Sequence, residues 1–84
     1  MEDKVGIVTH YFGKVSVAVL ALDKELQVGD SIHILGHSTD FTQKIASLEV
    51  EHEKIEVAEP GMDVALKVKS RVRNGDRVFK VTDD

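Results

Sequence analysis

The fold is decided by the stretch Val28-Gly29-Asp30-Ser31-Ile32-His33-Ile34-Leu35, in which a turn signal runs directly into a strand. Glycine can take the positive φ that a tight reversal needs, and aspartate can bond the backbone just ahead of it. The residues 31–35 then alternate polar and apolar, which is typical of a half-buried strand. The same order recurs at Asn74-Gly75-Asp76, before the run 77–81. Two such turns indicate a compact all-β domain, and neither is a catalytic motif.

Period-two alternation continues along the rest of the chain. The predicted strands cover residues 5–9, 15–22, 31–35, 41–50, 62–68 and 78–81. The run 15–22 is apolar on both faces towards its end, so we expect a central or covered strand there. Glu59-Pro60-Gly61 has the composition of a further turn.

Two of these strands carry a finer prediction. In the first, Val5, Ile7 and Thr9 are expected to share one face. In the run 41–50 the apolar positions change parity between Ile45 and Leu48. A strand cannot change parity without an extra residue, which predicts a β-bulge near 46–47.

Six strands with short connections and no helical periodicity predict a small closed six-stranded barrel with Greek-key-like order. We expect one domain over residues 1–84, with the barrel itself at about 4–82. Closure would remove the exposed edges that a small all-β chain must otherwise protect.

Composition narrows the classes of protein. The 84 residues contain no cysteine, which excludes disulfides and thiolate metal ligands. The charged N-terminus does not resemble a signal peptide, and no apolar run approaches the roughly 20 residues of a membrane-spanning helix. We therefore expect a cytoplasmic protein with no membrane partner.

Charge is distributed unevenly in a chain whose formal net charge is −4, a value that argues against strong unspecific binding to nucleic acid. Residues 49–63 carry six acids and one base, whereas 64–82 carry six bases and one acid. Within the basic segment, four cations fall at every second position: Lys67, Lys69, Arg71 and Arg73. Such a row can follow a phosphate backbone. The commoner explanation is the outer face of an amphipathic strand, balanced by glutamates on a neighbour.

Aromatic and polar residues at strand ends are candidates for a second kind of site, because rigid strands hold binding loops. They form two groups in the sequence: His10, Tyr11 and Phe12, and His37, Asp40 and Phe41. We expect these loop-end residues to bind a partner. Phe12 and Phe41 could equally fill the two mouths of a barrel.

Signals for metal binding and catalysis are weak. Three convergent imidazoles from His10, His33, His37 and His52 would make a zinc site, but the spacing does not show that they converge. The serines lie in no nucleophile elbow, and the phosphate-binding pattern Gly-x-x-x-x-Gly-Lys-Ser/Thr does not occur. We therefore predict no catalytic residues, no metal, no cofactor and no GTP binding.

An ordered series of short motifs resembles a known family. The series is Val5-Gly6-Ile7-Val8, Val17-Ala18-Val19, Leu26-x-Val28-Gly29-Asp30-x-Ile32-x-Ile34-x-Gly36, Lys44-Ile45-x-Ser47-Leu48-Glu49, Ala58-x-x-Gly61-x-x-Val64-x-Leu66 and Gly75-Asp76-x-Val78. It resembles the second domain of translational GTPases such as elongation factor Tu. The segments Thr9–Phe12, 32–43 and Glu51-His52 are similar to small stand-alone proteins described as translation elongation factor-like. A similar barrel ends some collagenase-like peptidases of the U32 type.

The resemblance implies a barrel that helps to hold the aminoacylated 3′ end of tRNA, with Glu49 in the position of the family's acidic residue. Val5-Gly6 stands where that pocket's aromatic residue is expected. We therefore predict a non-enzymatic module that lacks the GTPase domain and binds tRNA, rRNA or a ribosome-associated partner. The alternative is an accessory, protein-binding subunit of a separately encoded enzyme such as a U32-type peptidase.

Overall fold

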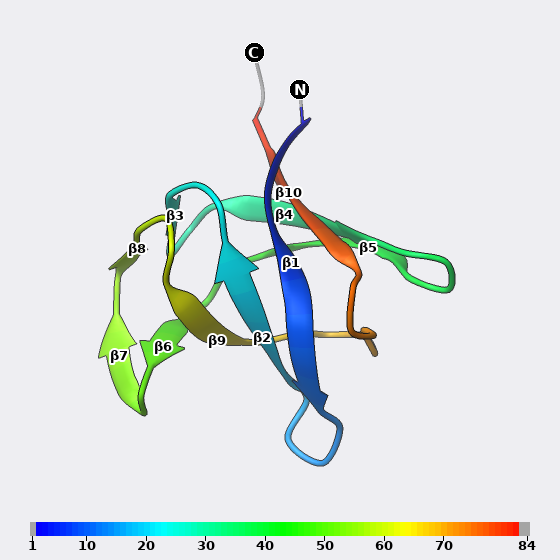
Figure 1. The fold of residues 1–84 in the computed structure, drawn as a ribbon, viewed down its shortest axis with the longest axis horizontal. Helices are drawn as coiled ribbons and strands as arrows, with labels where there is room; N and C mark the ends of the chain where they lie inside the picture. The colour runs from blue at the N-terminus through cyan, green and yellow to red at the C-terminus, as the bar shows by residue number, and fades with distance from the viewer. Residues whose placement is uncertain (1, 83–84) are drawn as a thin grey trace.

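The computed structural model describes residues 2–82, in which ten β-strands and no helix are found (Figure 1). The strands are β1 (Glu2–Phe12), β2 (Val17–Leu22), β3 (Leu26–Gln27), β4 (Ser31–Leu35), β5 (Asp40–Lys44), β6 (Leu48–Val50), β7 (Glu53–Ile55), β8 (Val57–Ala58), β9 (Asp63–Lys67) and β10 (Arg77–Val81). The all-β class is therefore confirmed. The ends of the predicted domain 1–84, residues 1 and 83–84, lie outside the described residues.

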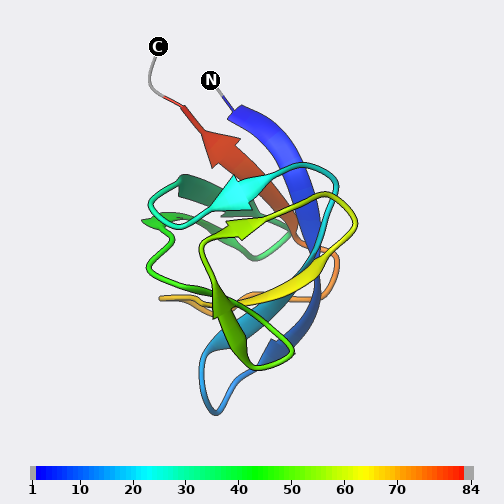
Figure 2. The same cartoon turned by 90° about the vertical axis from the view of Figure 1, so that its left-hand side faces the viewer.

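The strands form two antiparallel sheets. One has eight strands in the order β5-β4-β10-β1-β2-β9-β6-β7, and the other pairs β3 with β8. Figure 2 shows the strands curving around a common interior. Within residues 2–82 neither sheet closes on itself, so the predicted six-stranded barrel is not confirmed.

Isolated backbone bonds, not a ladder, connect the sheet edges to the loop after β3. The Gly29 N–H donates to the Ile45 carbonyl, the Ile45 N–H to the Asp30 carbonyl and the Val28 N–H to the Glu56 carbonyl, each at 2.9 Å. The loop after β3 therefore bonds to residues that follow β5 and β7, the two outer strands of the larger sheet.

The core lies on the inner face of the curved sheets. Its largest fully buried side chains include Leu20, Leu26, Ile32, Ile34, Ile45, Leu48, Val64 and Val78. The prediction that the second strand is central is confirmed, because β2 lies between β1 and β9. Its inward residues are buried, and its outward residues Val17, Val19 and Ala21 remain half-buried. An apolar outer face on a central strand is the feature that positions the site described below.

Two local predictions need correction. Val5 and Val8 are buried and Ile7 is 37% exposed, so the predicted face of Val5, Ile7 and Thr9 is wrong. The reason is that the register of β1 shifts between Lys4 and Gly6 and again between Val8 and His10. The β-bulge predicted near 46–47 is replaced by a break between two strands, since β5 ends at Lys44 and β6 begins at Leu48. The change in the alternation of apolar residues falls in this break.

Both Gly-Asp steps form turns of one kind. Gly29 and Gly75 have φ of 97° and 91°, and the N–H of the aspartate that follows donates to the carbonyl three residues earlier at 3.1 Å. These are the features of a type II turn. In each, the aspartate Oδ2 also accepts the N–H of the first turn residue at 2.9 Å. Glu59-Pro60-Gly61-Met62 has the same backbone bond at 3.2 Å, with φ of 90° at Gly61. The three predicted turns are therefore confirmed.

Candidate functional site

The loop-end residues predicted as one site lie in two places. His10, Tyr11 and Phe12 end β1, whereas His37, Asp40 and Phe41 belong to the β4–β5 hairpin at another corner of the molecule (Figure 1). Phe41 is half-buried and packs against the core, while the Phe12 side chain is 49% exposed. The two phenylalanines therefore differ in role: one contributes to folding and the other is available to a partner.

Asp40 is engaged by His33. The Asp40 Oδ1 atom lies 2.6 Å from His33 Nε2, and Glu2 Oε1 lies 2.8 Å from His33 Nδ1. These two hydrogen bonds, that with Glu2 first, raise the pKa of His33 above its usual value, and desolvation opposes them. Because each ring nitrogen already faces a carboxylate, His33 has no free lone pair for a metal. Among the described residues no group of three or more His, Cys, Asp or Glu could hold a metal ion.

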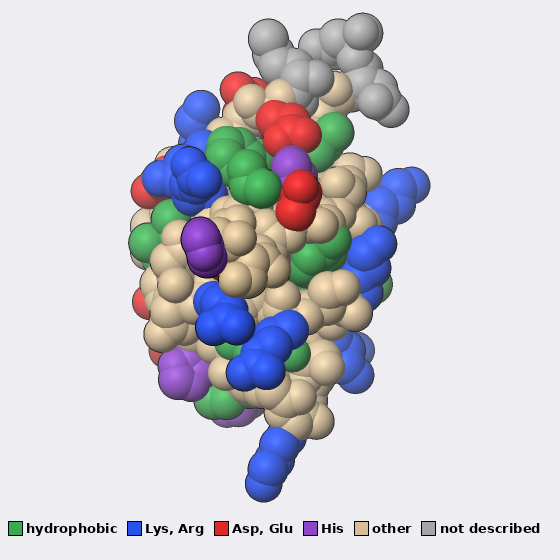
Figure 3. Space-filling view, turned by 90° about the vertical axis from the view of Figure 1, so that its right-hand side faces the viewer, with side chains coloured by type: hydrophobic (Ala, Val, Ile, Leu, Met, Phe, Trp, Pro, Cys, Tyr) green, Lys and Arg blue, Asp and Glu red, His purple; other side chains and the backbone are tan. Residues whose placement is uncertain are grey.

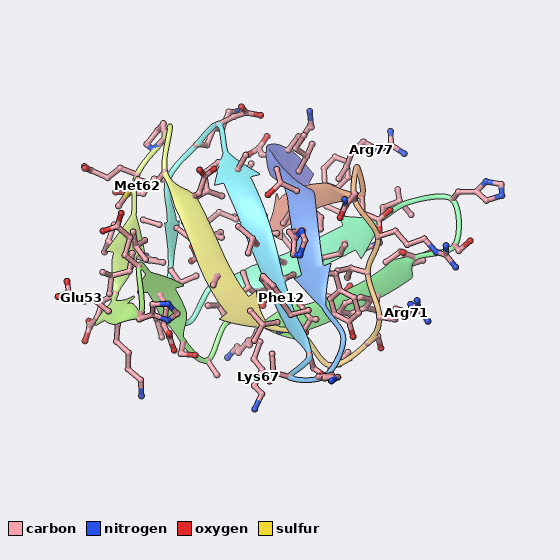
Figure 4. All side chains as sticks on the ribbon, turned by 60° about the horizontal axis from the view of Figure 1, so that its bottom comes forward. Phe12, Glu53, Met62, Lys67, Arg71 and Arg77 are labelled. Carbon is pink, nitrogen blue, oxygen red and sulfur yellow. The ribbon has the colours of Figure 1, made fainter. Side chains whose placement is uncertain are left out.

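The four cations of the basic stripe do not form one row on a strand. All four are exposed, but β9 ends at Lys67 and the chain then follows an irregular path. The Val68 N–H donates to the Ser16 carbonyl at 2.9 Å, and the Lys69 N–H donates to Gln43 Oε1 at 2.8 Å. Figure 4 shows Lys67 and Arg71 pointing to different sides of the molecule. On the face in Figure 3 the basic side chains are scattered.

Two grooves meet on the outer face of β2, β9 and β6. The first, of about 450 Å³, we call the acidic groove; it is lined by Phe12, Val19, Glu49, Val50, Glu51, His52, Asp63 and Ala65. The second, of about 190 Å³, we call the apolar groove; it is lined by Val15, Val17, Ser47, Glu49, Ala65, Leu66 and Lys67. Glu49 lies opposite Ala65 in the β6–β9 pairing, and both residues line both grooves. The grooves therefore form one continuous surface on either side of this pair.

The floor of this surface is apolar because β2 carries apolar residues on both of its faces. Val17 and Val19 point outward, next to Ala65 of β9, with which Val19 is in register. Phe12 forms one wall, and the His10 ring supports it with ring centroids 4.3 Å apart and an interplanar angle of 52°. An exposed aromatic ring beside an apolar floor is typical of a surface that binds another molecule.

The opposite wall is a strained turn. Val50 pairs with Glu53, so Glu51 and His52 alone connect β6 to β7, with φ of 51° and 67°. Positive φ at both positions marks a type I′ hairpin turn, for which Asn-Gly is the favoured sequence. Residues with side chains in this conformation cost of order 1–3 kcal/mol each, and such strain concentrates at functional sites. Neither residue type signals a turn, which is why pattern reasoning missed these two positions.

The fold of this chain is shared with a solved β-domain, and its sequence is similar to part of longer proteins. No family model matches the sequence. The fold is similar to the crystal structure of the C-terminal domain of a Geobacillus thermoleovorans protein assigned to the U32 peptidases, with a TM-score of 0.88 and 23% identity, covering 93% of this chain and 91% of that one. The selenomethionine variant of that domain gives a TM-score of 0.86, also at 23% identity, covering 90% of this chain and 96% of that one.

The curated proteins with similar sequences are named protease and collagenase. The chain is 36% identical over 77 residues to an uncharacterized protease of Methanocaldococcus jannaschii, which covers 90% of this chain and 19% of the protease. It is 32% identical over 78 residues to a collagenase of Porphyromonas gingivalis, covering 90% of this chain and 22% of the collagenase. The chain thus spans about a fifth of the length of these relatives.

These findings correct one expectation and limit another. The prediction of a non-enzymatic protein is overturned, because the relatives are named protease and collagenase and the structural neighbour is a domain of a U32 peptidase. The resemblance to U32-type peptidases is supported, whereas the resemblance to domain two of elongation factor Tu is not shown. RNA binding and ribosome binding receive no support from these relatives. No helix among residues 2–82 is long and apolar enough to cross a membrane.

Proposed function

We propose that this chain is a polypeptide-binding β-domain that serves a U32-type peptidase activity. The observation that carries the proposal is the match of 90% of this chain to about a fifth of a protease, with 36% identity. The similarity in fold to a domain at the C-terminus of a U32 peptidase supports a role for this chain beside a catalytic peptidase unit. In this role the chain binds a polypeptide and raises its concentration near the groups that cleave it.

The geometry of the ends supports this role. Glu2 of β1 is paired with Val81 of β10, so the two ends of the described chain lie side by side (Figure 1). Phe12 lies at the other end of the eleven-residue β1. A strand rises about 3.3 Å per residue, which separates the two ends of β1 by roughly 30 Å. A catalytic partner that docks near Glu2 and Val81 leaves both grooves open to a polypeptide.

The outer face offers the groups that an extended peptide needs. Val17, Val19 and Ala65 supply an apolar floor, and Glu49 and Lys67 supply charges of both signs at its rim. Peptide sites in proteins combine such apolar pockets with a few charged groups that fix orientation.

Affinity capture tests the proposal. The tagged chain is used as bait in extracts of its own cells, with and without nuclease, and the eluate is assayed for cleavage of a fluorogenic protein substrate. We expect peptidase activity that survives nuclease treatment. Capture of RNA or ribosomal proteins that disappear with nuclease, without peptidase activity, would overturn the proposal and restore the RNA-binding prediction.

A charge variant makes this test sharper. Replacing Lys69, Arg71 and Arg73 by glutamine removes most of the basic stripe and leaves every residue that lines the two grooves unchanged. The proposal predicts that peptidase capture is unchanged in this variant. If the chain instead binds RNA through the stripe, RNA recovery falls and its dependence on salt becomes weaker.

A further inference from the structure

We propose that the acidic groove binds a basic side chain of an extended peptide and that the apolar groove binds a neighbouring apolar side chain. This inference rests on the proposed polypeptide-binding function and specifies the class of peptide. Four observations carry it: the carboxylates in the groove, the exposed Phe12 ring, the strained turn and the continuity of the two grooves.

The first observation is charge. Three acidic residues line the acidic groove, Glu49, Glu51 and Asp63, and no lysine or arginine is among its lining residues. They belong to the acid-rich segment 49–63, in a chain with a net charge of −4. A concave surface lined by one sign of charge attracts the opposite charge and repels its own. The groove therefore selects a cation and disfavours an acidic peptide or a phosphate backbone.

The second observation is the aromatic wall. Phe12 is half-exposed on the same groove, and contact with the His10 ring holds its orientation. The face of an aromatic ring attracts an ammonium or guanidinium group that lies within about 6 Å of its centre. A carboxylate cluster facing an aromatic ring fits lysine or arginine, whose apolar stems also pack against Val19 and Ala65.

The third observation is the strain at Glu51 and His52. Positive φ is uncommon for a residue with a side chain, above all for a glutamate, and both residues line the acidic groove. An Asn-Gly turn would relieve the strain but would remove the Glu51 carboxylate. Strained backbones are concentrated at functional sites, and this one places Glu51 at the acidic groove.

The fourth observation is continuity. The apolar groove adjoins the acidic groove at Glu49 and Ala65, and Val15, Val17 and Leu66 line it. Val15 is 55% exposed, the highest exposed fraction of any large apolar side chain among the described residues. An extended peptide that places a basic side chain over the acidic groove therefore brings a neighbouring apolar side chain to the apolar groove.

Fluorescence anisotropy with two end-blocked, dye-labelled peptides tests the inference. The peptides are Ala-Val-Arg-Val-Ala and Ala-Val-Glu-Val-Ala. We expect the arginine peptide to bind about tenfold more tightly, the size expected for a close charge pair. Glu51→Gln should remove most of this difference and weaken the salt dependence. Phe12→Ala should reduce affinity by about threefold to tenfold, as expected for loss of a cation–aromatic contact.

Glu53→Gln is the matched control. Glu53 is an exposed glutamate on β7, it lines neither groove, and Figure 4 shows it on the outer side of the molecule, away from Phe12. Glu53→Gln changes the net charge by the same amount as Glu51→Gln. Equal effects of the two variants on peptide affinity would show that the preference for arginine comes from the overall charge of the protein, which would overturn the inference. Urea unfolding of each variant verifies that folding is preserved.

The outcomes separate this inference from the proposed function. Equal affinity for both peptides, or tighter binding of the glutamate peptide, overturns the basic-residue preference and leaves peptidase capture standing. Failure of both peptides to bind also overturns the inference. Loss of nuclease-resistant peptidase activity in the capture experiment overturns the proposed function itself.

Discussion

The surroundings of His33 (the His33 region) and the surface formed by the two grooves (the groove region) differ in whether their polar and apolar groups have partners within the protein. In the His33 region, both ring nitrogens of His33 are bonded to carboxylates from β1 and β5, and the neighbouring β4–β5 hairpin is tightly packed. In the groove region, Phe12 and Val15 are exposed and the turn at Glu51 and His52 is strained. The first arrangement contributes to holding strands together, and the second leaves surface and strain available to a partner.

This contrast teaches how to distinguish structural from binding residues among candidates that look alike in sequence. Asp40 and Glu49 are both acidic residues on strands, and sequence reasoning selected both. Asp40 is bonded to His33, whereas Glu49 lines both grooves. A polar group with a partner inside the protein serves the fold, and a group that lines a groove is free to serve binding.

The largest expected effect is a loss in the free energy of unfolding, and it tests how tightly the two regions are packed. A Cβ at Gly36 would collide with the Asp76 carboxylate, whose Cγ lies 2.6 Å away. Asp76 is only 5% exposed and also accepts the Arg73 N–H, so it cannot move away without loss. We expect Gly36→Ala to lower the free energy of unfolding by about 2–3 kcal/mol, as overpacking does.

Gly13→Ala in the groove region is the matched control for this measurement. A Cβ there meets only Tyr11 Cε2 at 3.6 Å, which is an ordinary contact. Its effect should stay within about 0.5 kcal/mol. Equal losses for both glycine variants, measured by urea unfolding, would show that the two regions are packed alike and would break the comparison.

A smaller effect on the free energy of unfolding, of opposite sign, is expected at the Glu51-His52 turn. The double replacement Glu51→Asn and His52→Gly installs the favoured type I′ sequence at two positive φ angles. We expect the free energy of unfolding to rise by about 1–2 kcal/mol, because strain of order 1 kcal/mol per residue is relieved. Arginine-peptide affinity should fall in the same variant. A stabilised variant with full affinity would remove Glu51 from the binding surface.

The smallest expected effect is a change of folding stability with pH, which arises from His33. Hydrogen bonds to Glu2 and Asp40 raise the pKa of His33 in the folded state above its usual 6.5. The folded state therefore binds the proton more tightly, and this stabilisation is complete below pH 6.5. It is lost as the pH rises from there through the raised pKa of the folded protein.

Urea unfolding across this pH range should therefore show falling stability in the unaltered chain and a flatter profile in His33→Gln. The control is His37→Gln, which replaces an exposed histidine of the β4–β5 hairpin and should leave the slope in place. A slope that persists in His33→Gln would assign the pH dependence to other groups.

Local sequence patterns determined several features because the forces behind them act over a few residues. Positive φ at Gly29, Gly61 and Gly75 and the alternation of β2 and β4 follow from backbone sterics and from burial of every second residue.

Only the tertiary structure decided the rest, because it depends on contacts between distant segments. The register shifts of β1 moved Ile7 to the surface, and within residues 2–82 neither sheet closes into the expected six-stranded barrel. The bonds of residues 68 and 69 to Ser16 and Gln43 divided the basic stripe. The grooves exist because β1, β2, β6 and β9 bring Phe12, Val19, Glu49 and Ala65 together, and no sequence spacing encodes that proximity. The sequence by itself determined where the chain turns and which residues alternate, while long-range strand pairing decided which side chains face one another.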